Sequence, residues 1–247
     1  MSQMIPMHTL YWPNMNPTIV GYHKKCWAKL GIEISYTERK ISHHDWLDSV
    51  LAEKLDSHEA IGFVDIDCIA YAREPVEQAM DFAVATGSFI GLAQSANHFP
   101  PLLPVYAAPS FLIISRAGYI QLGRPPLRAR HRLDAAQNLS AVADAIGFPY
   151  RAIYPIGYHR IPPEGPWRLG NYGYYGIGSE YDGFFHLYGS SVGNADLFAD
   201  TAERMLDGRG QVESFPYVCR TLTPPPPPSR PTGDKWLRDL RVLLRRY

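Results

Sequence analysis

Asp65 and Asp67 carry the strongest chemical signal in the sequence. The apolar, β-prone run 61–64 precedes both acids, which predicts that they stand at the carboxyl end of a central strand. Residues two apart on a strand face the same side, so two carboxylates placed there repel each other unless a cation lies between them. Mg²⁺ and Mn²⁺ prefer oxygen ligands and often bridge to phosphate. The pair indicates a divalent metal site, with a solvated strand end as the alternative.

His186 is the candidate for a third ligand. It follows two phenylalanines in a second apolar run, 182–189, which is expected to form a strand. A neutral imidazole there could complete a metal site and leave other positions for phosphate oxygens and water. The competing interpretation is a buried core histidine with one satisfied hydrogen bond.

Asp134 and Gln137 stand at the start of a segment, 134–146, that has helical periodicity. Asp134 is a good helix-capping residue, and capping alone would explain it. A carboxylate at this place could also orient a hydroxyl group or act as a base.

The segment 156–183 is rich in glycine, tyrosine and proline, and its pattern fits no regular element. A surface loop is the plain interpretation. The stretch 170–181 could instead cover a substrate, with glycine giving the backbone freedom and tyrosine offering ring faces for stacking.

Strand and helix patterns alternate through the rest of the chain, which predicts an α/β domain with a largely parallel sheet over residues 1–223. The expected strands are 7–12, 32–36, 61–67, 88–94, 110–115, 150–155 and 182–189. The expected helices are 16–30, 42–55, 75–87, 134–146 and 194–207.

The end of the chain has a different composition. Five prolines at 224–228 predict a stiff spacer, so 224–233 is interpreted as a linker. Residues 234–247 have apolar residues at helical spacing and a basic opposite face. This amphipathic helix could dock on the domain, meet an anionic membrane surface or bind a DNA backbone.

Composition excludes several classes. Lys plus Arg and Asp plus Glu both total 24, and a zero net charge argues against a surface built wholly for nucleic acid. No apolar run approaches the ~20 residues of a membrane span, and no secretory signal is visible. The 3 cysteines lie far apart, which favours a reducing, cytoplasmic setting, with peripheral contact at the inner membrane face left open.

The order of these motifs resembles a known family. A strand with DxD is followed by PSFLIIS (109–115), LDAAQNL (133–139) and FHLYG (185–189). This layout, over about residues 7–207, is similar to the GT-A-fold glycosyltransferases of the glycogenin and lipopolysaccharide-glycosyltransferase group. The resemblance implies a Rossmann-like, mixed, mostly parallel sheet flanked by helices. It also implies a nucleotide-sugar donor, a hydroxyl acceptor and bound Mn²⁺ or Mg²⁺.

The resemblance also implies roles for particular residues. His186 and Gly189 match the spacing of the late metal-binding histidine motif. In this comparison the metal ligands are Asp65, Asp67 and His186, the nucleotide-sugar contacts are Tyr11, Asn14, Asp65 and Gln94, and the reaction-centre residues are Asp134 and Gln137. The acceptor (a glycan, a lipid-linked glycan or a modified DNA base) and the stereochemical outcome stay open.

One departure from the family concerns charge. Val192 occupies the place of a lysine that clamps phosphate in the family motif, so an arginine would have to replace that lysine or the donor chemistry would differ.

Two alternatives remain. A haloacid-dehalogenase-like phosphatase also carries DxD after an apolar strand, but it needs a lysine between its motifs, and no lysine lies between Lys54 and Lys235. The second alternative is a non-catalytic module that binds glycan or a partner through its tyrosines.

Overall fold

The computed structural model of this protein describes residues 5–96, 104–128, 133–190 and 193–219. The expected domain end near Thr223, the linker 224–233 and the helix 234–247 lie outside these residues.

The main sheet has 6 strands in the order β2-β1-β3-β6-β5-β7. β1 pairs in parallel with β2 and β3, β5 pairs in parallel with β7, and β6 runs antiparallel to both of its neighbours. The sheet is therefore mixed, with β6 as the departure from a parallel arrangement. The strands are β1 (Met7–Tyr11), β2 (Ile34–Glu38), β3 (Ala60–Val64), β5 (Phe89–Ser95), β6 (Val105–Ser115) and β7 (Arg151–Ile153).

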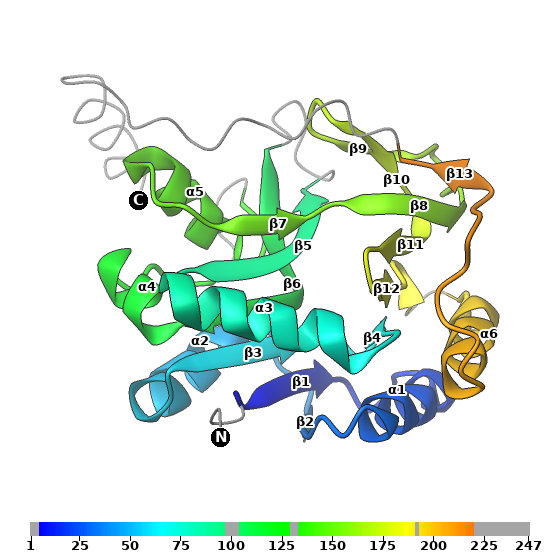
Figure 1. The fold of residues 1–247 in the computed structure, drawn as a ribbon, viewed down its shortest axis with the longest axis horizontal. Coiled ribbons are helices and arrows are strands. Elements are labelled where there is room, and N and C mark those ends of the chain that lie inside the picture. Colours follow the sequence, from blue (N-terminus) through cyan, green and yellow to red (C-terminus); the bar gives the residue numbers. More distant parts are fainter. Residues whose placement is uncertain (1–4, 97–103, 129–132, 191–192, 220–247) are drawn as a thin grey trace.

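Helices cover both faces of this sheet (Figure 1). One face packs against the buried side chains of α2 (His43–Lys54), α4 (Arg116–Gln121) and α5 (Gln137–Ile146), and the other against those of α1 (Pro17–Lys29) and α3 (Arg73–Thr86). A short 3-10 turn, Leu55–Ser57, follows α2. Both faces of the central strands are thus withdrawn from water, which agrees with the continuous apolar runs in their sequences.

The helix ends follow their sequence signals. The side chain of Asn16 accepts a hydrogen bond from the backbone of Thr18 at the start of α1, where Pro17 is the first helical residue. Ser42 caps α2 in the same way by accepting from Asp45. These caps fix where α1 and α2 begin, beside the carboxyl ends of β1 and β2.

A second sheet of 5 antiparallel strands, in the order β13-β8-β11-β12-β4, stands beside the first. Its strands are β4 (Cys68–Ala70), β8 (Pro155–Arg160), β11 (Ile177–Tyr181), β12 (Phe184–His186) and β13 (Tyr217–Val218). A separate hairpin pairs β9 (Trp167–Leu169) with β10 (Gly173–Tyr175). The expectation that 156–183 is irregular is therefore wrong, because that segment forms the hairpin and two strands of the second sheet, β8 and β11.

The turn between β11 and β12 consists of Asp182 and Gly183. Gly183 has φ +80°, and a Cβ atom there would come within 2.3 Å of the Pro75 ring. Only glycine combines that backbone angle with that close approach.

Helix α6 (Ala195–Leu206) packs along α1, and the two lie side by side in Figure 1. Their shared core includes Ile19, Cys26, Phe198 and Ala202, together with Phe185 of the second sheet. The main sheet, the second sheet and α6 are thus joined through α1.

Candidate metal centre

The turn 65–68 links the main sheet to the second sheet, because β3 ends at Val64 and β4 begins at Cys68. The backbone N–H of Asp65 donates to Ser110 (3.0 Å), and that of Cys68 donates to Asp65 (3.0 Å). The backbone N–H of Leu187 donates to Asp67 (2.9 Å). Asp65 and Asp67 therefore lie in a closed turn, and the expectation that both stand on the strand is corrected: a turn, and not strand pleating, brings their carboxylates together.

β12 brings His186 to this turn, because His186 stands opposite Cys68 in the β12–β4 pairing. Its Nε2 lies 3.2 Å from Oδ1 of Asp67 and 3.7 Å from Oδ2 of Asp65. One ligand atom from each of the three residues lies within 4.8 Å of the other two. The three residues that the sequence nominated for a metal are thus within reach of a single ion.

Burial and neighbouring charges shift the pKa values of the two acids of this cluster in opposite directions. The side chains of Asp65, Asp67 and His186 are only 27%, 13% and 5% exposed. Burial raises the pKa of Asp65 above its ordinary value, and repulsion from Asp67 adds to that rise. Burial also opposes ionisation of Asp67, but His186 and the Ser190 hydroxyl bring its pKa below the ordinary value. Among the described residues, the ion pairs of these two acids involve only histidines.

The donor set fits a divalent cation. Two carboxylates and one imidazole are ligands for Mn²⁺, and Mg²⁺ is also held by carboxylates together with phosphate oxygens. The Nδ1 atom of His186 is buried without a hydrogen-bond partner among the described residues, while Nε2 faces the acids. The imidazole therefore presents Nε2 to the place where an ion would sit.

The rings of His23 and Tyr188 are packed close to the cluster. His23 of α1 is fully buried, its Nδ1 is 3.0 Å from the Tyr36 hydroxyl, and burial lowers its pKa to about 3 despite the nearby charge of Asp67. Tyr188 stands edge-on to the His186 ring, with centroids 4.2 Å apart. His186 is thereby packed on its flank as well as paired through its strand.

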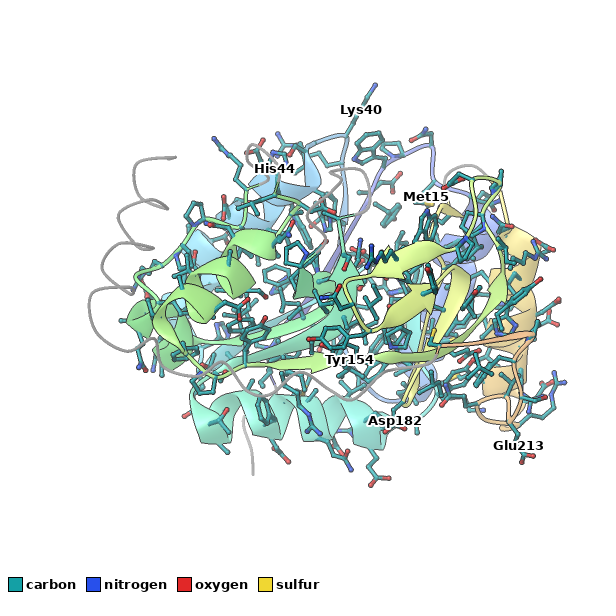
Figure 2. The ribbon with its side chains drawn as sticks, turned by 90° about the horizontal axis from the view of Figure 1, so that it is seen from above. Met15, Lys40, His44, Tyr154, Asp182 and Glu213 are labelled. Carbon is teal, nitrogen blue, oxygen red and sulfur yellow. The ribbon has the colours of Figure 1, made fainter. Side chains whose placement is uncertain are left out.

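Two hollows meet at the acids. The larger, of about 630 Å³, is lined by residues that follow β1 together with the turn 65–67 and part of the segment before α6. Its lining residues are Leu10, Tyr11, Trp12, Asn14, Met15, Asn16, Pro17, His43, Asp65, Ile66, Asp67, Ser190 and Gly193. Figure 2 shows Met15, which lines this hollow, on one side of the molecule and Asp182 of the β11–β12 turn on the opposite side.

The smaller hollow, of about 220 Å³, shares His43, Asp65 and Asp67 with the larger one. The rest of its lining is Gln94, Tyr106, Pro109, Asp134, Ala135, His186, Tyr188 and Gly189. The Tyr106 hydroxyl donates to Oδ2 of Asp134 (3.1 Å), and the backbone N–H of Ala135 donates to Oδ1 (2.7 Å). Asp134 is thus a fixed carboxylate on the wall of this hollow.

The structure places most of the sequence-nominated residues on these walls. Tyr11 and Asn14 line the larger hollow, Gln94, Asp134 and His186 line the smaller, and Asp65 and Asp67 line both. Gln137 does not line either hollow. It is buried at the start of α5, and its Oε1 accepts from the backbone N–H of Asp134 (2.8 Å), so it is corrected from a reaction-centre residue to a support for Asp134.

The expected covering loop 170–181 is also corrected. Tyr175 and Tyr181 are buried, and their hydroxyls donate to backbone oxygens of β5, at Ser95 (2.9 Å) and Ala93 (3.3 Å). Tyr175 thus fastens the β9–β10 hairpin to the main sheet, and Tyr181 fastens the second sheet to it. Gly170 lies in the turn of the β9–β10 hairpin, Gly173 and Gly178 lie within β10 and β11 at positive φ, and a Cβ atom on Gly176 would come within 2.6 Å of the Arg160 backbone oxygen.

The sequence did not nominate His43, Tyr106, Tyr188 or Trp12. Tyr188 could have been found, because it stands two residues after His186 and the period of a strand places both on one side. His43 and Tyr106 reach the site only through the packing of α2 and β6 on β3, and no local pattern shows this.

The described lining residues of both hollows include no lysine and no arginine. The replacement arginine expected from Val192 is therefore not found among them. A cation held by the acids would therefore be the main source of positive charge on the described walls.

Comparisons with known proteins add little. No family model matches the sequence, and no curated protein matches it. Among solved structures, one similar chain is A197 from STIV, with 13% identity, a TM-score of 0.39, and coverage of 56% of this chain and 78% of that chain. At that similarity the match defines neither fold nor function. In the described part of the chain, no helix is long and apolar enough to cross a membrane.

Proposed function

We propose that this chain is a metal-dependent glycosyltransferase that moves a sugar from a nucleotide-sugar donor to a hydroxyl acceptor. One observation carries the proposal: Asp65, Asp67 and His186 converge at the junction of a larger and a smaller hollow. A reaction that divides one substrate into a large nucleotide and a small sugar needs a site in two parts. The mixed α/β fold is compatible with the GT-A resemblance of the sequence without being specific for it.

The role of the cluster follows from charge. A divalent cation, Mn²⁺ or Mg²⁺, would stabilise the negative charge that develops on a departing nucleoside diphosphate. Asp65, Asp67 and His186 would hold that cation, and the imidazole nitrogen would favour Mn²⁺ because Mg²⁺ prefers oxygen ligands throughout. Since the described walls carry no lysine or arginine, this cation would supply most of the positive charge.

The two hollows divide the remaining tasks. In the larger, Tyr11 offers a ring and Asn14 an amide for the nucleoside. In the smaller, Gln94 and Asp134 offer hydrogen bonds to sugar and acceptor hydroxyls. With both oxygens already accepting one hydrogen bond, the Asp134 carboxylate is oriented to accept a hydroxyl proton or to position that hydroxyl.

The test is a donor screen that needs no acceptor. The purified chain is incubated with Mn²⁺ and a panel of UDP-, GDP-, CDP- and ADP-sugars, and release of the nucleoside diphosphate is followed by mass spectrometry. We expect slow, Mn²⁺-dependent hydrolysis of at least one donor, lost in Asp67→Asn and kept in Asp182→Asn, an exposed acid on the opposite side.

Thermal melting separates this function from a non-catalytic binding module. A ligand that binds only the folded chain raises the melting temperature. We expect Mn²⁺ with the matching nucleoside diphosphate to raise it, and Asp67→Asn to abolish the rise. If no nucleotide shifts the melting temperature with Mn²⁺ present, the glycosyltransferase proposal is wrong and a binding module is favoured.

A further inference from the structure

Asp65 lies between two imidazoles that come from different parts of the fold. Nε2 of His186, on β12, is 3.7 Å from Oδ2, and Nε2 of His43, at the start of α2, is 3.3 Å from Oδ1. The two oxygens of one carboxylate are thus divided between two histidines. The oxygen on the His186 side is the one that faces the three-residue cluster.

His43 is fixed in place by packing. Its ring stacks on Trp46, with centroids 5.8 Å apart and planes 20° apart. Trp46 is 3% exposed, donates from Nε1 to the Thr37 hydroxyl (3.3 Å) and stands edge-on to Phe63 of β3. β3 ends one residue before Asp65, so the platform under His43 and the carboxylate beside it share one rigid support.

An ionised carboxylate has no proton to give, so a hydrogen bond between His43 and Asp65 needs Nε2–H as its donor. Metal-binding carboxylates are commonly held by such outer donors, which fix the orientation of the ligand oxygen. His43 is not part of the group of ligand atoms that lie within 4.8 Å of one another. Its position suits orientation of a ligand and not coordination.

We infer that His43 is a positioning residue for the metal centre: its Nε2–H holds Oδ1 of Asp65, so that Oδ2 faces the cation together with Asp67 and His186. This inference rests on the proposed function for the presence of the cation. His43 lies outside the sequence motifs, and its stack on Trp46 keeps the ring beside Asp65. Two carboxylates that repel each other are thereby kept in the geometry that a cation needs.

The experiment measures Mn²⁺ affinity alone, by titration calorimetry and by electron paramagnetic resonance of free Mn²⁺, with no nucleotide and no turnover. His43→Phe keeps a ring on Trp46 but removes the donor. His43→Gln places an amide N–H near the position of Nε2. His44→Phe is the matched control, because His44 is adjacent, is similarly exposed at 31% against 35%, and lines neither hollow.

We expect His43→Phe to weaken Mn²⁺ binding about 10- to 100-fold, the range for loss of an outer partner of a metal ligand. His43→Gln should stay within a fewfold of the parent chain, and His44→Phe should be unchanged. Melting temperatures without metal show whether each variant is folded, and the glutamine variant keeps the test decisive if the phenylalanine variant is not.

Two results would overturn the inference while leaving the metal centre in place. His43→Phe could bind Mn²⁺ as tightly as the parent chain, which would show that the donor is idle. His43→Gln could bind as weakly as His43→Phe, which would make the imidazole itself a ligand. Absence of Mn²⁺ binding by the parent chain is a different result, because it removes the proposed metal function and the inference together.

Discussion

Two acid–imidazole clusters, one with a fully buried acid and one with partly buried acids, lie on opposite faces of the second sheet. Glu180 is on β11 and His186 on β12, and the pairing sets Ser179 opposite His186 and Glu180 opposite Phe185. Neighbouring residues on a strand face opposite sides, so Glu180 and His186 point away from each other. One sheet thus carries a carboxylate cluster on each face.

The clusters differ in how completely hydrogen bonds satisfy them. Glu180 is fully buried, and both of its oxygens are taken: the Tyr71 hydroxyl lies 2.8 and 2.9 Å from them, His159 Nε2 lies 2.8 Å from Oε1, and Gln211 donates to Oε2 (2.9 Å). Asp65 and Asp67 share one histidine, His186, and line two hollows. We propose that burial alone does not mark a functional acid, and that an incomplete set of partners beside open space does.

The largest expected effect is structural, at Glu180. Glu180→Ala takes the acceptor away from the partly buried donors of Tyr71 and His159, while Gln211 keeps only its bond to the Tyr181 backbone oxygen, which should lower the free energy of unfolding by about 3–5 kcal/mol. Chemical denaturation measures this loss, and Asp182→Ala, at the neighbouring exposed acid, should cost less than ~0.5 kcal/mol. If Glu180→Ala is as stable as the parent chain, the hydrogen bonds around Glu180 do not stabilise the fold. In folded molecules, Mn²⁺ affinity should be unchanged.

The opposite result is expected at Asp67. Asp67→Asn removes the repulsion on Asp65 but also the attraction to His186 that lowers the pKa of Asp67, so stability without metal should fall only slightly, whereas Mn²⁺ affinity should fall at least ~100-fold, beyond the range for an outer partner. Melting curves with and without Mn²⁺ measure both quantities on one sample. A variant that loses stability but keeps its Mn²⁺-induced shift would place Asp67 with Glu180 among the structural acids.

The sequence predicts one of these clusters and not the other, for a physical reason. Asp65 and Asp67 follow an apolar run within a few residues, so a local pattern marks them. The partners of Glu180 come from positions 71, 159 and 211, which only the finished fold brings together. His43 is a similar case, because its contact with Asp65 depends on how α2 packs on β3.

The same distinction applies to the fold. The longer strands of the main sheet and its capped helices follow from apolar runs and capping residues. The sequence predicts their succession along the chain, but not their order within the sheet. β8 and β11 have 6 and 5 residues against 5 in β1 and β3, so length does not hide them; their sequences lack the continuous apolar pattern of the main-sheet strands, and pairing partners decide their conformation. The apolar run 182–189, by contrast, predicts a strand where β12 forms. The Asp182–Gly183 dipeptide between apolar residues was the one local hairpin signal in that segment.

Asp134 tests whether an acid on the wall of the open site behaves like Asp67 or like Glu180. Tyr106→Phe removes one of its two donors and should lower turnover of the donor substrate about 10-fold, equivalent to ~1.4 kcal/mol, with Mn²⁺ affinity unchanged. Tyr119→Phe is the control, since that buried hydroxyl donates to Pro125 and lines neither hollow. Equal turnover in both variants would leave Asp134 without a part in the reaction.

The smallest effect on stability is expected at Asp144 on α5, which has an incomplete set of hydrogen-bond partners and lines neither hollow. Asp144 as a whole residue is exposed, but its carboxyl group is partly withdrawn from water. This withdrawal raises the pKa of the carboxyl group to about 6, and a hydrogen bond with the Tyr150 hydroxyl opposes the rise with a smaller effect. A carboxyl whose pKa is raised by folding stabilises the chain below its ordinary pKa and loses that contribution as pH rises through about 6.

Asp144→Asn has no such titration. Its stability relative to the parent chain should therefore increase by about 1 kcal/mol between pH 4 and pH 7.5, a value discounted for the solvent around this carboxyl. Denaturation midpoints of both chains across that range measure the difference. A flat difference would show that withdrawal from water costs this acid nothing. Incomplete hydrogen bonding would then matter only where, as at Asp65 and Asp67, two acids face each other.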